Sequence, residues 1–161
     1  MNHHLDQLIA NRGHKPKMLV VDDQAINIRV IHSLFKSQFD VIMAMNGEQA
    51  LSQAEQHRPD LIILDVMMPD MDGYEVCRRL KANPATRAIP VVFVTAHNDP
   101  ADEIQGILLG AIDFISKPIN AVLVEARMKT YITFKLQTDL LRSMGALDGS
   151  TGAASGKRAD E

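Results

Sequence analysis

Residues 61–73 read Leu61-Ile62-Ile63-Leu64-Asp65-Val66-Met67-Met68-Pro69-Asp70-Met71-Asp72-Gly73, an apolar run followed directly by a loop rich in aspartate. A continuous apolar run of this length, bounded by turn residues, is typical of a strand buried on both faces of a parallel sheet. Asp72 is followed three residues later by Glu75, the spacing of a capping box, which predicts the start of a helix. The stretch therefore predicts a buried strand, a polar loop and a helix in succession.

The same succession recurs on both sides of this stretch. Further apolar runs are Met18-Leu19-Val20-Val21, Val41-Ile42-Met43-Ala44-Met45, Val91-Val92-Phe93-Val94 and the shorter Phe114-Ile115. The segments between the runs are long enough for helices, and two of them carry helix signals. Gly47 opens a segment that ends near His57, and Asp99-Pro100 has the pattern of an N-cap followed by a proline at the first helical position.

Five strand–helix repeats predict an α/β protein with a parallel sheet and helices on both faces, because right-handed crossovers place the helices there. At this chain length the natural choice is the flavodoxin-like fold, a (βα)5 three-layer sandwich with strand order 2-1-3-4-5. The pattern alone does not separate this fold from a small Rossmann variant.

The chain divides into four segments on this interpretation. We expect a flexible leader over residues 1–16, the α/β domain over 17–128, an extension of the fifth helix over 129–144, and a disordered tail or truncated output-domain stub over 145–161. The extension rests on an apolar stripe with a four-residue period, formed by Met128, Ile132, Leu136, Leu140 and Met144. A strict seven-residue repeat is not maintained, so a long coiled coil is not expected.

Composition narrows the classes of protein that remain. The formal net charge of −3 and the pI of about 6.0 give no reason to expect a nucleic-acid partner. Cys77 is the single cysteine, so an internal disulfide is impossible and a reducing compartment fits best. No apolar stretch approaches the roughly 20 residues of a membrane span, and residues 1–6 lack the features of a signal peptide. We therefore expect a cytoplasmic protein without a membrane partner.

Polar side chains follow four of the five apolar runs. Asp22 and Asp23 follow the first, Asp65 the third and Thr95 the fourth, and Lys117 comes shortly after the fifth. The carboxyl ends of parallel strands open on one edge of the sheet, so these side chains should converge there. Clustered carboxylates repel one another unless a cation binds between them, and a set of oxygen ligands favours Mg²⁺.

This set of groups has a plausible chemistry. A carboxylate can attack phosphorus to give an aspartyl phosphate. Phosphoryl transfer needs charge neutralisation and in-line positioning more than acid–base catalysis. Mg²⁺ and the ammonium of Lys117 would supply positive charge, and Thr95 could donate a hydrogen bond to a phosphoryl oxygen.

Four motifs in this order resemble the response-regulator receiver domain of two-component signalling. They are Asp22-Asp23, the segment from Leu64 to Gly73, Val94-Thr95-Ala96 and Lys117-Pro118. The resemblance runs from about Met18 to about Arg127, essentially the whole predicted core. It supports the flavodoxin-like fold and implies a role for each motif.

The resemblance implies these roles residue by residue. Asp65 matches the phosphoacceptor, and Asp22 and Asp23 match the acidic pair that holds Mg²⁺ together with Asp65 and the backbone carbonyl of Met67. Lys117 matches the lysine that binds the phosphoryl group, and the Lys117–Pro118 bond is expected to be cis. The remaining matches are the switch hydroxyl Thr95, the switch aromatic Phe114, and the positions that tune the phosphate lifetime, Met67 and His97.

The resemblance also implies a signalling function. A sensor histidine kinase or histidine phosphotransfer protein would present phosphohistidine to Asp65. Phosphorylation would then switch a face made by the fourth helix, the fifth strand and the fifth helix, which meets a partner or forms a homodimer. The domain would promote only its own phosphorylation and dephosphorylation, so it is not classed as an enzyme.

The end of the chain resembles a degraded opening of a diguanylate cyclase domain, over residues 147–161. This predicts regulation of a cyclic di-GMP output that is missing from this chain, and an arbitrary flexible tail is the alternative. Two other functions stay open. One is an interaction domain that works without phosphorylation, and the other is a haloacid-dehalogenase-like phosphatase. The phosphatase is disfavoured because that family has a second Asp where Met67 stands.

Overall fold

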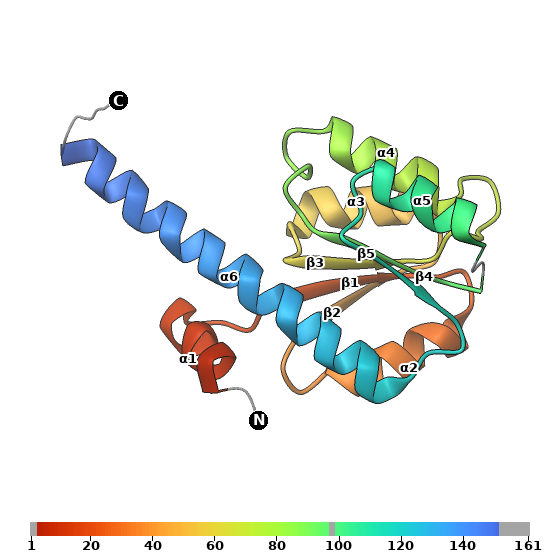
Figure 1. Ribbon diagram of the computed structural model, residues 1–161, viewed down its shortest axis with the longest axis horizontal. Helices are drawn as coiled ribbons and strands as arrows, with labels where there is room; N and C mark the ends of the chain where they lie inside the picture. The colour runs from red at the N-terminus through yellow and green to blue at the C-terminus, as the bar shows by residue number, and fades with distance from the viewer. Residues whose placement is uncertain (1–2, 97–98, 152–161) are drawn as a thin grey trace.

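The computed structural model describes residues 3–96 and 99–151, with only the helical backbone described for residues 146–151. Five strands form one parallel sheet in the order β2-β1-β3-β4-β5 (Figure 1). The strands are β1 (Lys17–Val21), β2 (Asp40–Ala44), β3 (Leu61–Leu64), β4 (Val91–Thr95) and β5 (Asp113–Ser116). The predicted flavodoxin-like fold and its strand order are confirmed.

Helices cover both faces of this sheet. They are α1 (His3–Arg12), α2 (Ala25–Phe35), α3 (Gly47–His57), α4 (Gly73–Ala82), α5 (Pro100–Leu108) and α6 (Ala121–Thr151). Helices α3, α4 and α5 lie on one face, and α1, α2 and α6 lie on the other (Figure 1). Because α1 precedes the first strand, the fourth and fifth helices of the predicted (βα)5 core are α5 and α6.

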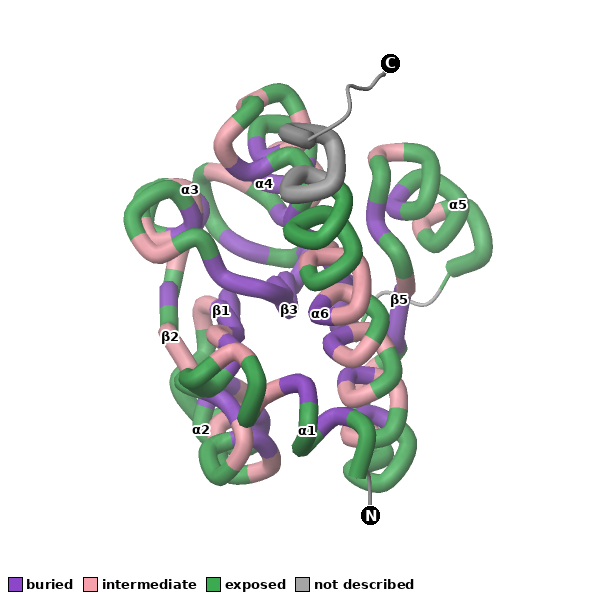
Figure 2. Tube along the Cα trace, turned by 90° about the vertical axis from the view of Figure 1, so that its left-hand side faces the viewer, coloured by how far each residue is buried: buried purple, intermediate pink, exposed green. Residues whose placement is uncertain are grey.

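Strand β1 shows why the apolar runs are continuous. Met18 and Val20 belong to the core under α2 and α6, whereas Leu19 and Val21 belong to the core under α3 and α4. Successive side chains of a strand point to opposite faces, so a strand covered on both faces needs an apolar residue at every position. The buried segments are visible along the sheet in Figure 2.

Helix starts follow the signals in the sequence. The Asp72 carboxylate accepts a hydrogen bond from the Glu75 amide, and the Asp99 carboxylate accepts one from the Ala101 amide. The Glu75 side chain does not return to Asp72, because it pairs with Arg78 and Arg79 along α4. The capping box predicted at α4 is therefore formed in its first half only.

Helix α6 extends away from the domain (Figure 1). In its apolar stripe Met128, Ile132 and Leu136 are buried, whereas Leu140 and Met144 are exposed. The helix continues to Thr151, past its predicted end at Met144, because adding residues to a formed helix avoids the cost of nucleation. Residues 145–151 are thus helical rather than disordered, and the rest of the predicted tail lies outside the described residues. No described helix, α6 included, combines the length and apolarity needed to cross a membrane.

The leader also differs from the flexible segment that we predicted. Residues His3–Arg12 form α1, whose Leu5 and Leu8 are buried in the core that contains α6. A helix this short is marginal on its own in water, so packing on α6 must supply its stability. The sequence shows too few apolar positions there to reveal that packing.

Gly73, the first residue of α4, has no space for a side chain next to the backbone of Asp65. An added Cβ on Gly73 would overlap the backbone carbonyl of Asp65, while one on Gly145 would meet nothing within 4 Å. We expect Gly73→Ala to lower the free energy of unfolding by about 2–4 kcal/mol, through forced backbone movement. Gly145→Ala should leave it unchanged or raise it by up to about 1 kcal/mol. Urea denaturation of both variants measures this, and equal effects would contradict the packing described.

Candidate functional site

The carboxyl ends of β1, β3, β4 and β5 surround one cavity of about 660 Å³. Among the residues lining it are Asp23, Asp65, Thr95 and Lys117, and the neighbouring cavity includes Asp22. The structure thus brings together all five polar residues that the sequence placed at strand ends. They come from segments far apart in the chain, and only the parallel sheet makes them neighbours.

Three carboxylates form the centre of this site. One oxygen each from Asp22, Asp23 and Asp65 lies within 4.8 Å of the others. Asp22 and Asp65 are buried and Asp23 is partly exposed. An oxygen-only cluster that is open on one side has the ligand chemistry of a hard divalent cation that keeps some of its waters.

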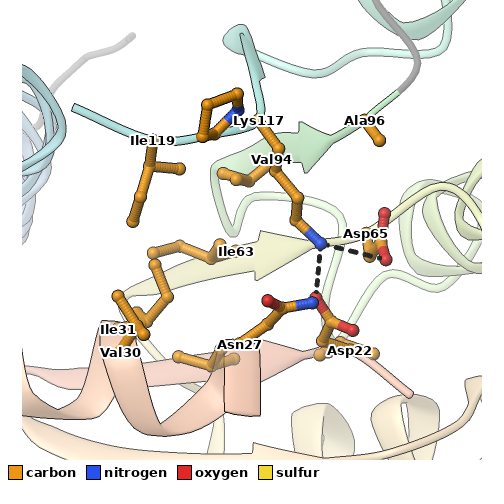
Figure 3. Close-up of a pocket in the computed structure, with 13 residues that line it drawn as sticks. Asp22, Asn27, Val30, Ile31, Ile63, Asp65, Val94, Ala96, Lys117 and Ile119 are labelled. Atoms are coloured by element: carbon orange, nitrogen blue, oxygen red, sulfur yellow. Dashed lines mark hydrogen bonds and ion pairs between the residues drawn. The ribbon is translucent and has the colours of Figure 1, made fainter. Parts of the chain in front are cut away.

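Lys117 neutralises part of this charge. Its Nζ lies 2.8 Å from Asp22 Oδ2 and 3.4 Å from Asp65 Oδ2 (Figure 3). Burial works against the charged ammonium, but the hydrogen bond to Asp22 and the charge of Asp65 outweigh it, so the pKa of Lys117 is raised. The lysine therefore stays protonated and serves as a fixed positive charge beside two carboxylates.

The surroundings of Asp65 disfavour the ionised form of its carboxyl group. Burial raises the pKa of its carboxyl, Lys117 lowers it, Asp22 raises it again, and a hydrogen bond from Thr95 lowers it. The net direction is upward. One lysine does not balance three carboxylates, so a bound cation would relieve the remaining repulsion.

Backbone hydrogen bonds fix the acceptor loop and the lysine. The Asp65 amide donates to the Val21 carbonyl at 3.0 Å, and the Gly73 amide donates to the Val66 carbonyl at 2.8 Å. The Lys117 amide donates to the Thr95 carbonyl at 2.7 Å. The peptide bond between Lys117 and Pro118 is cis, as the resemblance implied.

Phe114 lies inside the domain in this structure. Its ring is buried, and its centroid is 5.9 Å from that of Phe93. Gly106 of α5 packs against both rings, so closely that an added Cβ would lie 3.0–3.1 Å from them. Thr95 is buried one strand away, with its side chain hydrogen bonded to Asp65.

The first residue of β5 is tied to α6. The Asp113 carboxylate accepts hydrogen bonds from the Tyr131 hydroxyl and, at 3.3 Å, from Arg127 Nη1. Burial and the bond to Asp113 raise the pKa of Tyr131 to about 12. The strand that carries Phe114 is therefore bonded to the long helix one residue before that ring.

Two residues at this site were not predicted from the sequence, and the predicted roles of Met67 and His97 stay predictions. Gln24 and Asn27 line the cavity, and the Gln24 amide donates to Asp22 Oδ1 at 2.9 Å. Their position in the first turn after Asp22 and Asp23 is the signal that could have found them. The Met67 side chain is exposed and its carbonyl stays a predicted ligand, while His97 lies outside the described residues.

Comparison with known families agrees with this geometry. The family model described as the response regulator receiver domain matches residues 18–129. The chain belongs to the response-regulator receiver family. The match ends before most of α6 and begins after α1, so both helices extend the receiver domain itself.

Two curated relatives show how much of a longer protein this receiver corresponds to. The response regulator PleD of Caulobacter vibrioides is 44% identical over 144 residues, which cover 89% of this chain and 32% of PleD. A probable cyclic di-GMP phosphodiesterase of Vibrio cholerae is 36% identical over 143 residues, covering 81% of this chain and 32% of that protein. The chain spans about a third of the length of these relatives.

A solved receiver structure bears on the acidic cluster. The receiver domain of the sensor histidine kinase PA1611 from Pseudomonas aeruginosa, solved with a magnesium ion coordinated in its active-site cleft, matches with a TM-score of 0.67 and 28% identity. The match covers 73% of this chain and 98% of that domain.

The raised pKa of Asp65 has a measurable consequence for stability. The pKa of Asp65 is higher in the folded protein than in the unfolded chain. At a pH above the folded-state pKa, ionisation of Asp65 therefore lowers the free energy of unfolding. This loss of stability disappears below the unfolded-state pKa near 3.9. We expect Asp65→Asn to stabilise the metal-free protein at pH 7 and to lose that advantage near pH 3. Denaturation with a chelator present measures this. The exposed Asp40→Asn serves as control, and an equal gain there would contradict the assignment.

Proposed function

We propose that this receiver accepts a phosphoryl group on Asp65 from a phosphohistidine of a sensor histidine kinase or histidine phosphotransfer protein. The observation that carries the proposal is the Asp65 carboxylate, set in an open cavity with Lys117 at 3.4 Å and two further carboxylates within 4.8 Å. Membership of the receiver family supports the same chemistry.

The acidic cluster fits Mg²⁺. Asp22 and Asp23 would hold it with Asp65 and the backbone carbonyl of Met67, and when bound it would supply positive charge that stabilises the transferred phosphoryl group. Every side-chain donor in this set is a carboxylate oxygen, and Asp23 is the partly exposed one. The magnesium in the related PA1611 receiver supports this choice of ion.

The transfer itself needs one bond made and one broken. A carboxylate oxygen of Asp65 attacks the phosphorus, the bond from phosphorus to the histidine nitrogen breaks, and the imidazole leaves with that electron pair. The ammonium of Lys117 already lies within hydrogen-bond distance of the Asp65 carboxylate. It would bind the phosphoryl oxygens once the group has been transferred. No proton has to leave Asp65, since the attacking group is the carboxylate.

Switching would follow from the groups next to Asp65. Thr95 donates to the Asp65 carboxylate before phosphorylation and would donate to the phosphoryl group afterwards, leaving space that Phe114 can fill. The face so affected is made by α5, β5 and α6. It already exposes large apolar side chains, namely Ile104, Ile107, Leu108 and Ile112. We propose that this face binds a partner or a second copy of the receiver.

The output we propose is control of cyclic di-GMP levels. One relative is named as a probable cyclic di-GMP phosphodiesterase, and residues 147–161 resemble the opening of a diguanylate cyclase domain. The receiver would act there as a cytoplasmic signalling domain and not as an enzyme on a separate substrate. A haloacid-dehalogenase-like phosphatase is disfavoured, because Met67 supplies no carboxyl group two residues after Asp65.

Phosphorylation can be measured directly. After incubation with Mg²⁺ and acetyl phosphate, intact-protein mass spectrometry should show one added phosphoryl group on the wild type and none on Asp65→Asn. Asp40→Asn, which changes an exposed aspartate away from the cavity, should label like the wild type. An unlabelled wild type that also fails to bind beryllofluoride would refute phosphotransfer and favour an interaction domain that works without it.

Thr95 allows phosphorylation and switching to be separated. Thr95→Ala removes the hydroxyl that links the acceptor to the switch, so we expect labelling of Asp65 to persist. Hydrogen exchange over residues 99–116 should respond to phosphorylation in the wild type and at most about a tenth as much in the variant. A full response in Thr95→Ala would show that the hydroxyl does not carry the switch.

A further inference from the structure

Helix α5 is held to the domain by little apolar burial. Within residues 100–108, which the structure describes throughout, Gly106 is the only buried one. The neighbouring helix α4 buries Val76, Cys77 and Leu80 as well as its first glycine. Packing of an apolar face supplies most of the stability of a helix in a protein, so a helix without such a face depends on single contacts. The position of α5 is therefore decided by a few individual interactions.

Tyr74 of α4 makes one of these interactions. Its hydroxyl donates a hydrogen bond, at 3.1 Å, to the backbone carbonyl of Asp102 in the first turn of α5, the helix next to α4 in Figure 1. Its ring packs edge-on against Phe93 of β4, with the ring centroids 5.4 Å apart. Burial and the carboxylates of Asp102 and Asp72 raise the pKa of Tyr74, so the hydroxyl keeps the proton that it donates. The ring is thus fixed on the sheet while the hydroxyl holds α5.

The backbone that carries Tyr74 is fixed against the phosphoacceptor loop. Tyr74 follows Gly73, which lies so close to the Asp65 carbonyl that an added Cβ would overlap it. The Gly73 amide also donates a hydrogen bond to the Val66 carbonyl at 2.8 Å. Atoms packed this closely move together, so the start of α4 and the acceptor loop behave as one unit. Tyr74 therefore connects the Asp65 loop to α5 by a path that does not include Thr95.

A displacement of α5 would break the bond from Tyr74. Thr95 is the last residue of β4, and α5 begins five residues later at Pro100. A movement of Thr95 toward a phosphoryl group would pull on the start of α5 through the chain. The Tyr74 bond opposes that pull at the first turn of α5, because its own ring stays packed on Phe93. One hydrogen bond changes an equilibrium only several-fold, so it can bias a switch without locking it.

We propose that Tyr74 is a positioning residue that holds α5 in the arrangement of the unphosphorylated receiver and so sets how readily the face of α5, β5 and α6 switches. The inference rests on phosphotransfer to Asp65, as proposed above, and adds a restraint to it. Tyr74 does not line the cavity around Asp65, so it acts through α5 and not on the transferred group. Loss of its hydroxyl favours the switched arrangement, whereas loss of the Thr95 hydroxyl removes the group that drives it.

The test is Tyr74→Phe in the full chain, which keeps the ring on Phe93 and removes only the hydroxyl. Without a phosphodonor, hydrogen exchange of residues 100–109 should rise about fivefold, the effect of one hydrogen bond, while β1 and β3 stay protected. Beryllofluoride, a phosphoryl mimic, should bind the variant about fivefold more tightly in the presence of Mg²⁺, because the displacement of α5 then opposes binding less. A residue that only stabilised the fold would not tighten this binding when removed.

Thr133→Val is the matched control, since it removes another hydroxyl that donates to a helix carbonyl, that of Lys129 in α6. It should leave both measurements as in the wild type. Unchanged exchange of residues 100–109 in Tyr74→Phe would overturn the proposal, as would faster exchange without tighter binding of beryllofluoride. An equal rise of exchange in β1 and β3 would show a general loss of stability and would also overturn it. A wild type that binds no beryllofluoride would refute the proposed phosphotransfer, and the exchange of α5 would then decide the restraint by itself.

Discussion

The crowding of three carboxylates at one edge of the sheet is the constraint on which the structure depends. Asp22, Asp23 and Asp65 lie within 4.8 Å of one another, and Lys117 offsets only part of their repulsion. Folding must therefore bring like charges together. The free energy that opposes their repulsion comes from burial of the two apolar cores, one on each face of the parallel sheet. The tight contact of α4 behind Asp65 belongs to the same arrangement, since any movement of that loop would disperse the cluster.

Much of the fold and the site follows from the sequence because the strands are covered on both faces. A doubly covered strand must be apolar at each position, as Leu61–Leu64 is, so its end is marked by the first polar residue. That residue lies at the edge where parallel folds carry their sites. The expected positions of Asp65 and Thr95 thus came from burial alone, whereas their roles needed the resemblance to receivers.

Features that depend on distant partners could not be predicted in this way. Helix α1 has two well-buried leucines, and their burial is decided by α6, more than a hundred residues away in the chain. Asp60 shows the same difficulty, because an aspartate before a strand is usually a turn residue, and only the fold brings Arg12 and Lys135 to it. The end of α6 was misplaced because a single glycine such as Gly145 costs a formed helix only about 1 kcal/mol, which is too little to end it.

The bonds from Asp113 to Tyr131 and Arg127 give α6 the geometry of a lever. Its fulcrum lies at the strand that carries Phe114, and from Tyr131 to Thr151 the helix extends for about 30 Å at 1.5 Å per residue. A tilt of about 10° at the fulcrum would move the far end by about 5 Å, as large as one helical turn. Displacements near Asp113 that are small on the scale of the core would therefore be enlarged several-fold at the tip of the helix.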